Sequence, residues 1–294
     1  MATLLPTEQI NPHTHGLDRL TPKQLARVIN AEDFNAARAV KKAGAQIAAA
    51  LVLAAQTYSK KHKIIFIGAG TSGRLGVLEA VECVPTFGTK PGQIRGLIAG
   101  GKKAMFRSQE GAEDNDKQGA REIAQVAAQE DFVIGLTASG RTPYVLGALK
   151  KAKQLGAHTA LMTCNPAADT SNVQIHICLQ TGAEALSGST RMKAGSATKM
   201  ALNAITTGAM ALCGKTYGNL MVDVQPTNKK LVARAIRLIC EIAQTDEKTA
   251  SRLLKTSGGR VKTAVVMHRK KITRSAAEKQ IKKAKGFLRG ALDD

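Results

Sequence analysis

The chain has 294 residues, of which 44% are hydrophobic and 3% aromatic, and its formal net charge is +21 at pH 7. A chain of this length can bury one large core together with a small appendage. It contains no apolar run of 18 residues, and no basic segment followed by a long apolar one near its start. These features argue against a membrane-spanning or secreted protein and predict a cytoplasmic one. Five dispersed cysteines without a CxxC pair also argue against a disulfide framework and a zinc site.

The first part of the chain predicts a polar arm followed by helices. Residues 1–20 are polar and contain prolines. Thr21 and Pro22 then suit the cap and the first position of a helix. The alanine-rich residues 33–58 predict one long helix that leads into the first strand.

The first strand is predicted by residues 64–67, an Ile-Ile-Phe-Ile run without polar alternation. Such a run is typical of a parallel strand that helices bury on both faces. Further strands are predicted at residues 94–98, 132–138, 159–163 and 175–179. Helix-length segments separate the strands from each other, and this alternation predicts a doubly wound α/β fold with a parallel sheet.

A glycine-rich loop follows the first strand, and Gly68, Gly70 and Gly73 satisfy the pattern GxGxxG. A dinucleotide site needs an acidic residue at the end of the next strand, but residues 99–102 are Ala-Gly-Gly-Lys. A Walker loop needs Lys followed by Ser or Thr, whereas this loop continues with Arg-Leu. Neither class of nucleotide site therefore fits.

A phosphate site fits this loop better. With Gly70, the hydroxyls of Thr71 and Ser72 lie at a predicted helix N-terminus, where free backbone N–H groups and the helix dipole suit a phosphate monoester. For this loop alone, a tight turn with a helix cap and no ligand stays open as the alternative.

The same chemistry recurs after the strand at residues 132–138. Ser139, Gly140 and Thr142 form a second turn with glycine and hydroxyls, and Pro143 suits the first turn of the next helix. Seen alone, Ser139 or Thr142 is an equally good candidate for a plain helix cap. Two such turns at the carboxyl ends of strands, however, lie where open α/β sheets bind ligands.

A third loop is dense in hydroxyls and cations. It follows the last predicted strand and precedes a long helix. The predicted substrate contacts in it are Ser187, Ser189, Thr190 and Lys193. Glu184 is either a further active-site acid or a neighbour of the helix cap.

The C-terminal residues predict a basic helical region. Residues 241–294 predict three short helices with breaks near residues 256–259 and 271–273. Residues 215–294 contain 19 Lys and Arg against 7 Asp and Glu, but only two aromatic residues. Because stacking platforms for nucleic acid bases are missing, we expect a solvated surface that binds nucleic acid only weakly and nonspecifically.

Motifs along nearly the whole chain carry a family resemblance. In chain order they are TEQINP, GAGTSGRLGVLEAVECVPTFG, IAGG, EGAEDN, TASGRTPYV, SGSTRMKAGSATKMALN and VDVQPTN. With these motifs the chain resembles the N-acetylmuramic acid 6-phosphate etherases of the sugar isomerase (SIS) superfamily. The resemblance implies a five-stranded parallel sheet and a homodimer whose two subunits both contribute to the site.

The resemblance also implies a reaction and its catalytic residues. The family cleaves the D-lactyl ether of N-acetylmuramic acid 6-phosphate, which makes it a lyase of peptidoglycan amino-sugar recycling. Glu82 matches the proposed proton donor of the family, and Glu113 matches a second catalytic acid. Lys230 matches a lysine that approaches the open-chain sugar, with a plain surface lysine as the alternative. No metal or other cofactor is required.

Three segments of the chain are therefore expected, and one main function with two alternatives. Residues 1–50 form an arm and helices, residues 51–222 the SIS-type domain that binds the sugar phosphate, and residues 223–294 a helical region. An etherase is the main hypothesis. A sugar-phosphate isomerase and a noncatalytic sugar-phosphate sensor are the alternatives, and neither needs both Glu82 and Glu113.

Overall fold

The computed structural model describes residues 4–293, which fold into two compact units. The first unit comprises the residues up to Val81 together with Gly92–Thr206, and the second comprises Glu82–Pro91 with the residues from Thr207 onward. The domain boundaries expected at residues 50 and 222 stay predictions. Among the described residues, no helix is both long and apolar enough to cross a membrane.

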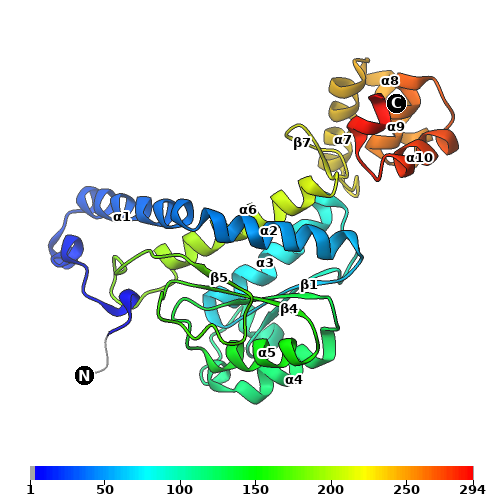
Figure 1. Ribbon diagram of the computed structural model, residues 1–294. Coiled ribbons are helices and arrows are strands. Elements are labelled where there is room, and N and C mark those ends of the chain that lie inside the picture. The colour runs from blue at the N-terminus through cyan, green and yellow to red at the C-terminus, as the bar shows by residue number, and fades with distance from the viewer. Residues whose placement is uncertain (1–3, 294) are drawn as a thin grey trace. The chain divides into compact units, whose positions relative to one another are not determined.

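The N-terminal arm leads into two helices of the first unit (Figure 1). The arm contains three short 3-10 helices, η1 (Pro6–Glu8), η2 (Pro12–Thr14) and η3 (Leu17–Arg19). Helix α1 spans Pro22–Lys42 and begins with a capping box, in which Thr21 and Gln24 bond each other's backbone N–H groups.

Helix α2 spans Gly44–Ser59, so the single helix expected over residues 33–58 is interrupted. The interruption falls at Ala43, directly before Gly44, and glycine is a common site of helix breaks because it lacks a side chain to hold the helical conformation.

The centre of the first unit is a five-stranded parallel sheet, as predicted. Its strands in chain order are β1 (Ile64–Gly68), β2 (Ile94–Ile98), β3 (Phe132–Leu136), β4 (His158–Thr163) and β5 (Ile175–Cys178). They pair in the order β2-β1-β3-β4-β5. All residues of β1 and β3 are buried, which explains their uninterrupted apolar sequences.

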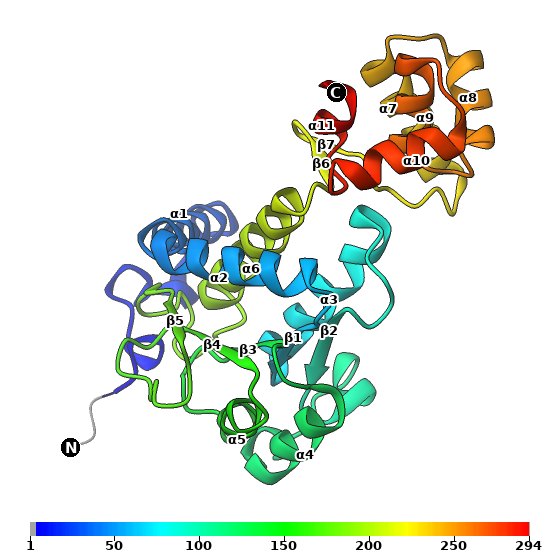
Figure 2. The ribbon, with the colours of Figure 1, turned by 45° about the vertical axis from the view of Figure 1, so that its right-hand side comes forward.

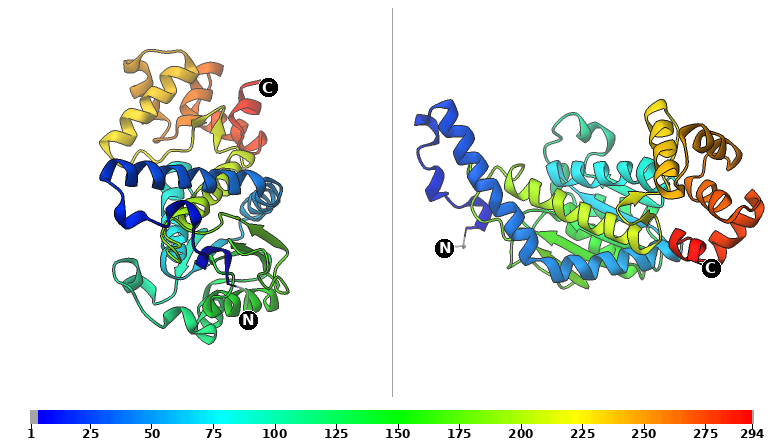
Figure 3. Two further views of the ribbon diagram at one scale, coloured as in Figure 1. Left: turned by 90° about the vertical axis from the view of Figure 1, so that its left-hand side faces the viewer. Right: turned by 90° about the horizontal axis from the view of Figure 1, so that it is seen from above.

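Helices cover both faces of this sheet (Figure 2). One face carries α2 and the first-unit parts of α3 (Gly70–Phe87) and α6 (Lys193–Leu212), which run over the sheet in Figure 3. The other face carries α4 (Asp116–Val126) and α5 (Pro143–Gln154). The fold is therefore the doubly wound α/β class expected from the sequence.

The helices α4 and α5 approach each other closely because glycines lie at their contact. A Cβ atom on Gly119 would lie 1.9 Å from the carbonyl oxygen of Tyr144, and one on Gly147 would lie 2.3 Å from that of Asp116. Buried apolar side chains of both helices and the sheet, such as Ile123 and Leu149, form the core on this face.

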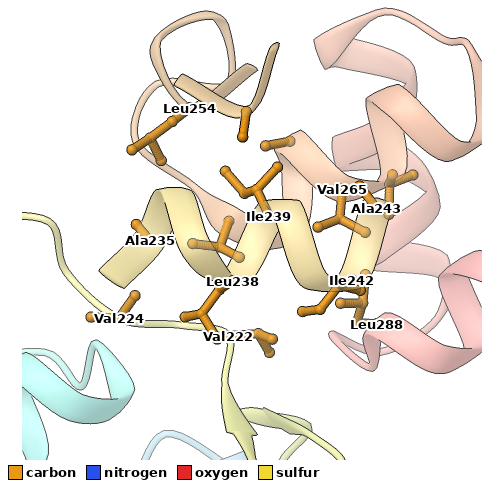
Figure 4. Close-up of a cluster of buried hydrophobic side chains, with 14 of the residues drawn as sticks. Val222, Val224, Ala235, Leu238, Ile239, Ile242, Ala243, Leu254, Val265 and Leu288 are labelled. Atoms are coloured by element: carbon orange, nitrogen blue, oxygen red, sulfur yellow. The ribbon is translucent and has the colours of Figure 1, made fainter. Parts of the chain in front are cut away.

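The second unit is a helical bundle with a small hairpin. The hairpin pairs β6 (Thr216–Tyr217) with β7 (Leu220–Met221). The helices are α7 (Lys229–Ala243), α8 (Glu247–Thr256), α9 (Val261–Lys270), α10 (Arg274–Lys283) and α11 (Leu288–Asp293). Leu238, Ile239 and Ile242 of α7 pack with Val265 and Leu288 in its core (Figure 4).

The breaks predicted in the tail separate α8, α9 and α10. Gly258 and Gly259 follow α8 with φ angles of 69° and 78°, a conformation that favours glycine, and Lys271 ends α9 with φ of 54°. The prediction of three short helices missed α11, whose Leu288 and Ala291 are buried in the core of this unit.

Candidate active site

The connections after β1 and β3 leave the sheet at its topological switch point. From β1, helix α3 leads to β2 on one side, whereas β3 leads through α5 to β4 on the other. Gly68 at the end of β1 pairs with Leu136 at the end of β3, so the two following loops begin side by side. Open α/β sheets bind ligands at this position.

A cavity of about 230 Å³ lies at this point, and we call it the hydroxyl cavity. Three loops, the N-terminal arm with Glu8, and Glu113 surround it. It is lined by Thr7, Glu8, Ala69, Gly70, Thr71, Ser72, Glu113, Leu136, Thr137, Ala138, Ser139, Thr142 and Thr190.

Glycines make the first of these loops a tight strand-to-helix turn. A Cβ atom on Gly68 would lie 2.8 Å from the backbone nitrogen of Gly73, and Gly70 has a φ angle of 51°. Helix α3 therefore begins at once, and the N–H groups of its first turn have no acceptor within the helix. Together with the hydroxyls of Thr71 and Ser72, they offer donors for the oxygens of a phosphate.

The second loop presents a chain of hydroxyl groups. The Oγ1 atom of Thr137 lies 2.7 Å from Oγ1 of Thr142 and 3.2 Å from Oγ of Ser139. Thr142 occupies the cap position of α5, but its side chain makes no cap hydrogen bond. The amide of Asn165 donates to the carbonyl oxygen of Ser139 at 2.9 Å, and Gly140, with φ of 69°, provides the turn.

The third loop is held by the N-terminal arm. The hydroxyl of Ser187 donates to the carbonyl oxygens of Glu8 and Gln9, and the N–H of Gly188 donates to that of Thr7 at 3.1 Å. These bonds place the exposed side chain of Glu8 at the hydroxyl cavity. Glu8 belongs to the motif TEQINP but is not among the site residues predicted from the sequence.

A buried polar network lies behind the third loop. Both carboxylate oxygens of Glu184 accept backbone N–H groups at 2.9 Å, from Lys193 and Ala194, at the start of α6. Burial raises the pKa of Glu184. The Lys193 ammonium is hydrogen-bonded to Glu32, which also accepts from the amide of Asn11 at 2.7 Å.

Hydrogen bonds to Glu32 favour its charged form. Burial opposes the charged form, but the bonds from Lys193 and Asn11 and the positive charge of Lys193 outweigh it and lower the pKa of Glu32. The network thus joins α1 and α6 through charged groups and the arm through the neutral amide of Asn11.

Glu113 lies on η5 (Ala112–Asp114) at the junction of two cavities. Besides the hydroxyl cavity, it lines a smaller cavity of about 140 Å³. This second space, the Arg74 cavity, is lined by Ala69, Gly70, Arg74, Ala99, Ala104, Ser108, Gln109, Glu110, Gly111 and Glu113.

Comparison with known proteins decides the family. Residues 46–153 match the glucokinase regulatory protein N-terminal SIS domain, and residues 114–208 match the SIS domain. The chain is 48% identical to the N-acetylmuramic acid 6-phosphate etherase of Microcystis aeruginosa, over 97% of this chain and 94% of the relative. It is 45% identical to the N-acetylmuramic acid 6-phosphate etherase of a Geobacillus species, over 99% of this chain and 100% of the relative. The chain belongs to the N-acetylmuramic acid 6-phosphate etherase family.

A further etherase, the second of Vibrio cholerae, is 44% identical over 99% of this chain and 95% of its own length. The similarity to the etherases thus extends over both units.

Seven of the residues predicted for an etherase site come together in the structure. Those that line the hydroxyl cavity are Gly70, Thr71, Ser72, Glu113, Ser139, Thr142 and Thr190. Gly140, Glu184, Ser187, Ser189 and Lys193 do not line it. Gly140 and Ser187 shape or hold the loops around it, and Lys193 and Glu184 belong to the buried network.

Two residues predicted for the etherase site lie in the second unit. Glu82 on α3 and Lys230 in the first turn of α7 are both exposed. Neither lines the hydroxyl cavity. Glu79, which is also on α3, is buried and accepts hydrogen bonds from Thr206 and Lys199. The carboxylates of Glu79 and Glu82 therefore differ in their surroundings.

Proposed function

We propose that the protein is a carbon–oxygen lyase that cleaves the D-lactyl ether of N-acetylmuramic acid 6-phosphate, giving N-acetylglucosamine 6-phosphate and D-lactate. Membership of the etherase family over nearly the full length supports this function. The single observation that carries it within the fold is the presence of Glu113 in the same cavity as the hydroxyls of the β1 and β3 loops. The reaction belongs to the recycling of cell-wall amino sugars.

The hydroxyl cavity binds the 6-phosphate in this proposal. Its donors are the first-turn N–H groups of α3 and the hydroxyls of Thr71, Ser72, Ser139 and Thr142. These donors are uncharged, and backbone N–H groups at a helix N-terminus favour an anion through their aligned dipoles. The sugar extends from there toward Glu113.

The chemistry proceeds by elimination and then addition of water. In the open-chain sugar the ether oxygen on C3 is β to the C1 aldehyde, which acidifies the C2 proton. One carboxylate removes that proton while an acid protonates the departing lactate oxygen, and water then adds to the resulting enal at C3. The two steps need groups in opposite protonation states, which two glutamates in different surroundings supply.

We assign proton transfer at C2, or activation of water, to Glu113 and protonation of the lactate oxygen to Glu82. Glu113 lines the cavity of its own chain, whereas Glu82 is exposed and does not. The family resemblance implies a homodimer with a site built by both subunits, and the assignment takes Glu113 from one subunit and Glu82 from the other. Lys230 is a further candidate contact to the open-chain sugar.

Exposed apolar side chains support the homodimer. Phe34 of α1, Leu78 and Val81 of α3, and Met200 of α6 are 59%, 42%, 61% and 41% exposed in the single chain. Where such side chains form a contiguous patch, they often mark a protein interface. A second copy of the chain would cover them with a twofold-related surface.

A cytoplasmic location completes the proposal. None of the cysteines in the described part of the chain forms a disulfide, as is usual in a reducing compartment.

The proposal is tested by incubating the purified protein with N-acetylmuramic acid 6-phosphate and measuring D-lactate and N-acetylglucosamine 6-phosphate. Equal amounts of the two products are expected. Isomerised sugar phosphate without lactate would favour a SIS-type isomerase, and tight binding without turnover would favour a sugar-phosphate sensor.

A further inference from the structure

The Arg74 cavity adjoins the hydroxyl cavity and differs from it in chemistry. Both cavities are lined by Ala69, Gly70 and Glu113, so they meet at the start of α3. The hydroxyl cavity has Thr and Ser side chains and no Lys or Arg, whereas the smaller cavity has the guanidinium of Arg74. Two adjoining spaces thus offer different donors to an elongated ligand.

Only the Nε atom of the Arg74 guanidinium is hydrogen-bonded within the described residues. Its Nε atom donates to the carbonyl oxygen of Met105, at the end of η4 (Gly101–Met105), with a distance of 3.3 Å. Within residues 4–293, its two terminal amino groups have no hydrogen-bond partner, and no carboxylate lies within ion-pair distance of it. The side chain is half-buried. A guanidinium in this state can bind a carboxylate with two parallel hydrogen bonds.

The acidic residues of this cavity do not neutralise Arg74. Glu110 and Glu113 both line the cavity, and both are exposed to water. Solvent screens the repulsion that exposed carboxylates exert on a bound anion, whereas the contact with a half-buried guanidinium is screened less. Ser108 and Gln109 add neutral polar groups to the same wall.

We infer that Arg74 binds the carboxylate of the lactyl group of the substrate. This inference rests on the proposed function, because that substrate carries a phosphate on C6 and a carboxylate on the ether substituent of C3. With the phosphate in the hydroxyl cavity and the carboxylate on Arg74, the C3 atom and its ether oxygen lie between the two anions, and C2 is bonded directly to C3. Glu113 lines both cavities and is therefore placed where proton transfer at C2 occurs. Arg74 selects sugars that carry the lactyl acid.

The substitution Arg74→Gln tests this assignment, because one ligand contains the carboxylate and the other does not. For N-acetylmuramic acid 6-phosphate, kcat/KM is expected to fall about 10- to 100-fold, the usual effect of losing a charge-assisted hydrogen-bonded pair. The inhibition constant of N-acetylglucosamine 6-phosphate, which lacks the lactyl group, is expected to change less than about 3-fold. Arg74→Lys, which keeps the charge but not the fork, should give an intermediate loss.

Arg107→Gln is the matched control. Arg107 is exposed, follows η4 in the same connection, and lines neither cavity. The substitution Arg107→Gln removes the same charge as Arg74→Gln. It should leave kcat/KM for N-acetylmuramic acid 6-phosphate and the inhibition constant of N-acetylglucosamine 6-phosphate unchanged. Retained binding of N-acetylglucosamine 6-phosphate by Arg74→Gln also shows that the variant is folded.

Two results would overturn the assignment. If Arg74→Gln weakens the binding of both ligands equally, Arg74 binds the phosphate or the sugar that the two ligands share. If it weakens the binding of neither ligand, the Arg74 cavity is not a substrate site. Failure of the proposed function is distinguishable, because the wild-type protein would then release no lactate. In that case the dissociation constants of the two sugar phosphates, measured by calorimetry on wild type and Arg74→Gln, still show whether Arg74 recognises the lactyl carboxylate.

Discussion

The hydroxyl oxygens of Thr137 and Thr142 lie 2.7 Å apart at the carboxyl end of β3. Thr142 is the cap residue of α5 by position, yet its hydroxyl bonds another hydroxyl at the cavity and not the helix backbone. One of these hydroxyls donates its proton to the other, whose own proton is then left to donate to a bound anion. The second loop therefore presents hydroxyls to the cavity as well as starting a helix, and its contact with the ligand stays a prediction.

Replacing Thr142 with valine should weaken substrate binding without unfolding the protein. The substitution keeps the shape of the side chain and removes one donor to the phosphate, so we expect kcat/KM to fall about 10-fold. Steady-state kinetics with N-acetylmuramic acid 6-phosphate measure the effect. Thr256→Val is the control, because Thr256 is an exposed residue on α8 whose hydroxyl bonds only its own helix. Equal kinetics for Thr142→Val and wild type would remove Thr142 from the phosphate site.

Glu113→Gln should abolish most of the turnover. Glutamine keeps the size of the side chain but cannot transfer a proton, so kcat is expected to fall by about 100-fold or more. The KM value should change little, since the phosphate contacts remain. Asp114→Asn changes the adjacent exposed carboxylate on η5, which does not line the hydroxyl cavity, and should retain normal kcat. Turnover near the wild-type rate in Glu113→Gln would exclude this residue as the proton carrier.

Mixing two inactive variants tests whether the site is shared between subunits. In a mixed dimer of Glu82→Ala and Glu113→Ala chains, one of the two sites would combine intact Glu113 from one chain with intact Glu82 from the other. After subunit exchange at equal concentrations, random pairing would therefore restore about a quarter of the wild-type activity. Each variant alone, carried through the same exchange, is the control. No recovery, despite mixed dimers seen by mass spectrometry, would place both acids in the site of one chain.

The stability of the first unit should depend on pH through Glu32. Its pKa is lowered in the folded state, so its contribution is full above about pH 4.5, the value for a free glutamate, and is lost as pH falls through the lowered pKa. Glu32→Gln leaves the buried Lys193 ammonium without its carboxylate and should cost about 3 kcal/mol at pH 7. The difference in the free energy of unfolding between Glu32→Gln and wild type should become smaller as the pH falls below 4.5.

Hydrogen exchange of the amides in α1 and at the start of α6 measures this difference within the first unit alone. Glu241→Gln, an exposed substitution on α7 of the second unit, should leave those amides unchanged. A difference for Glu32→Gln that stays constant down to pH 3 would contradict the assigned role of the ion pair.

The sequence predicted the parts of the structure that are local in the chain. The apolar runs of β1 and β3 identified buried parallel strands, and the hydroxyl residues after them identified the two loops that meet at the switch point. Glycines 68, 70 and 140 also carried local information, because their turns need either close approach or a positive φ angle.

The parts that depend on distant contacts were not predictable from local patterns. Glu8 reaches the cavity because the arm bonds a loop about 180 residues later, and no periodicity reports such a contact. Lys193 was expected to bind substrate because it belongs to a stretch dense in hydroxyls and cations, but in the fold it is buried against Glu32. Its role in the site stays a prediction, as do those of Glu82 and Lys230.

The central claim is cleavage of the ether by elimination and hydration, and an isotope experiment tests it most directly. The protein is incubated with N-acetylmuramic acid 6-phosphate in water enriched in oxygen-18, and both products are analysed by mass spectrometry. We predict equimolar D-lactate and N-acetylglucosamine 6-phosphate, with the solvent oxygen at C3 of the sugar and none in the hydroxyl of lactate. Absence of lactate, or label in the lactate hydroxyl, would contradict the account.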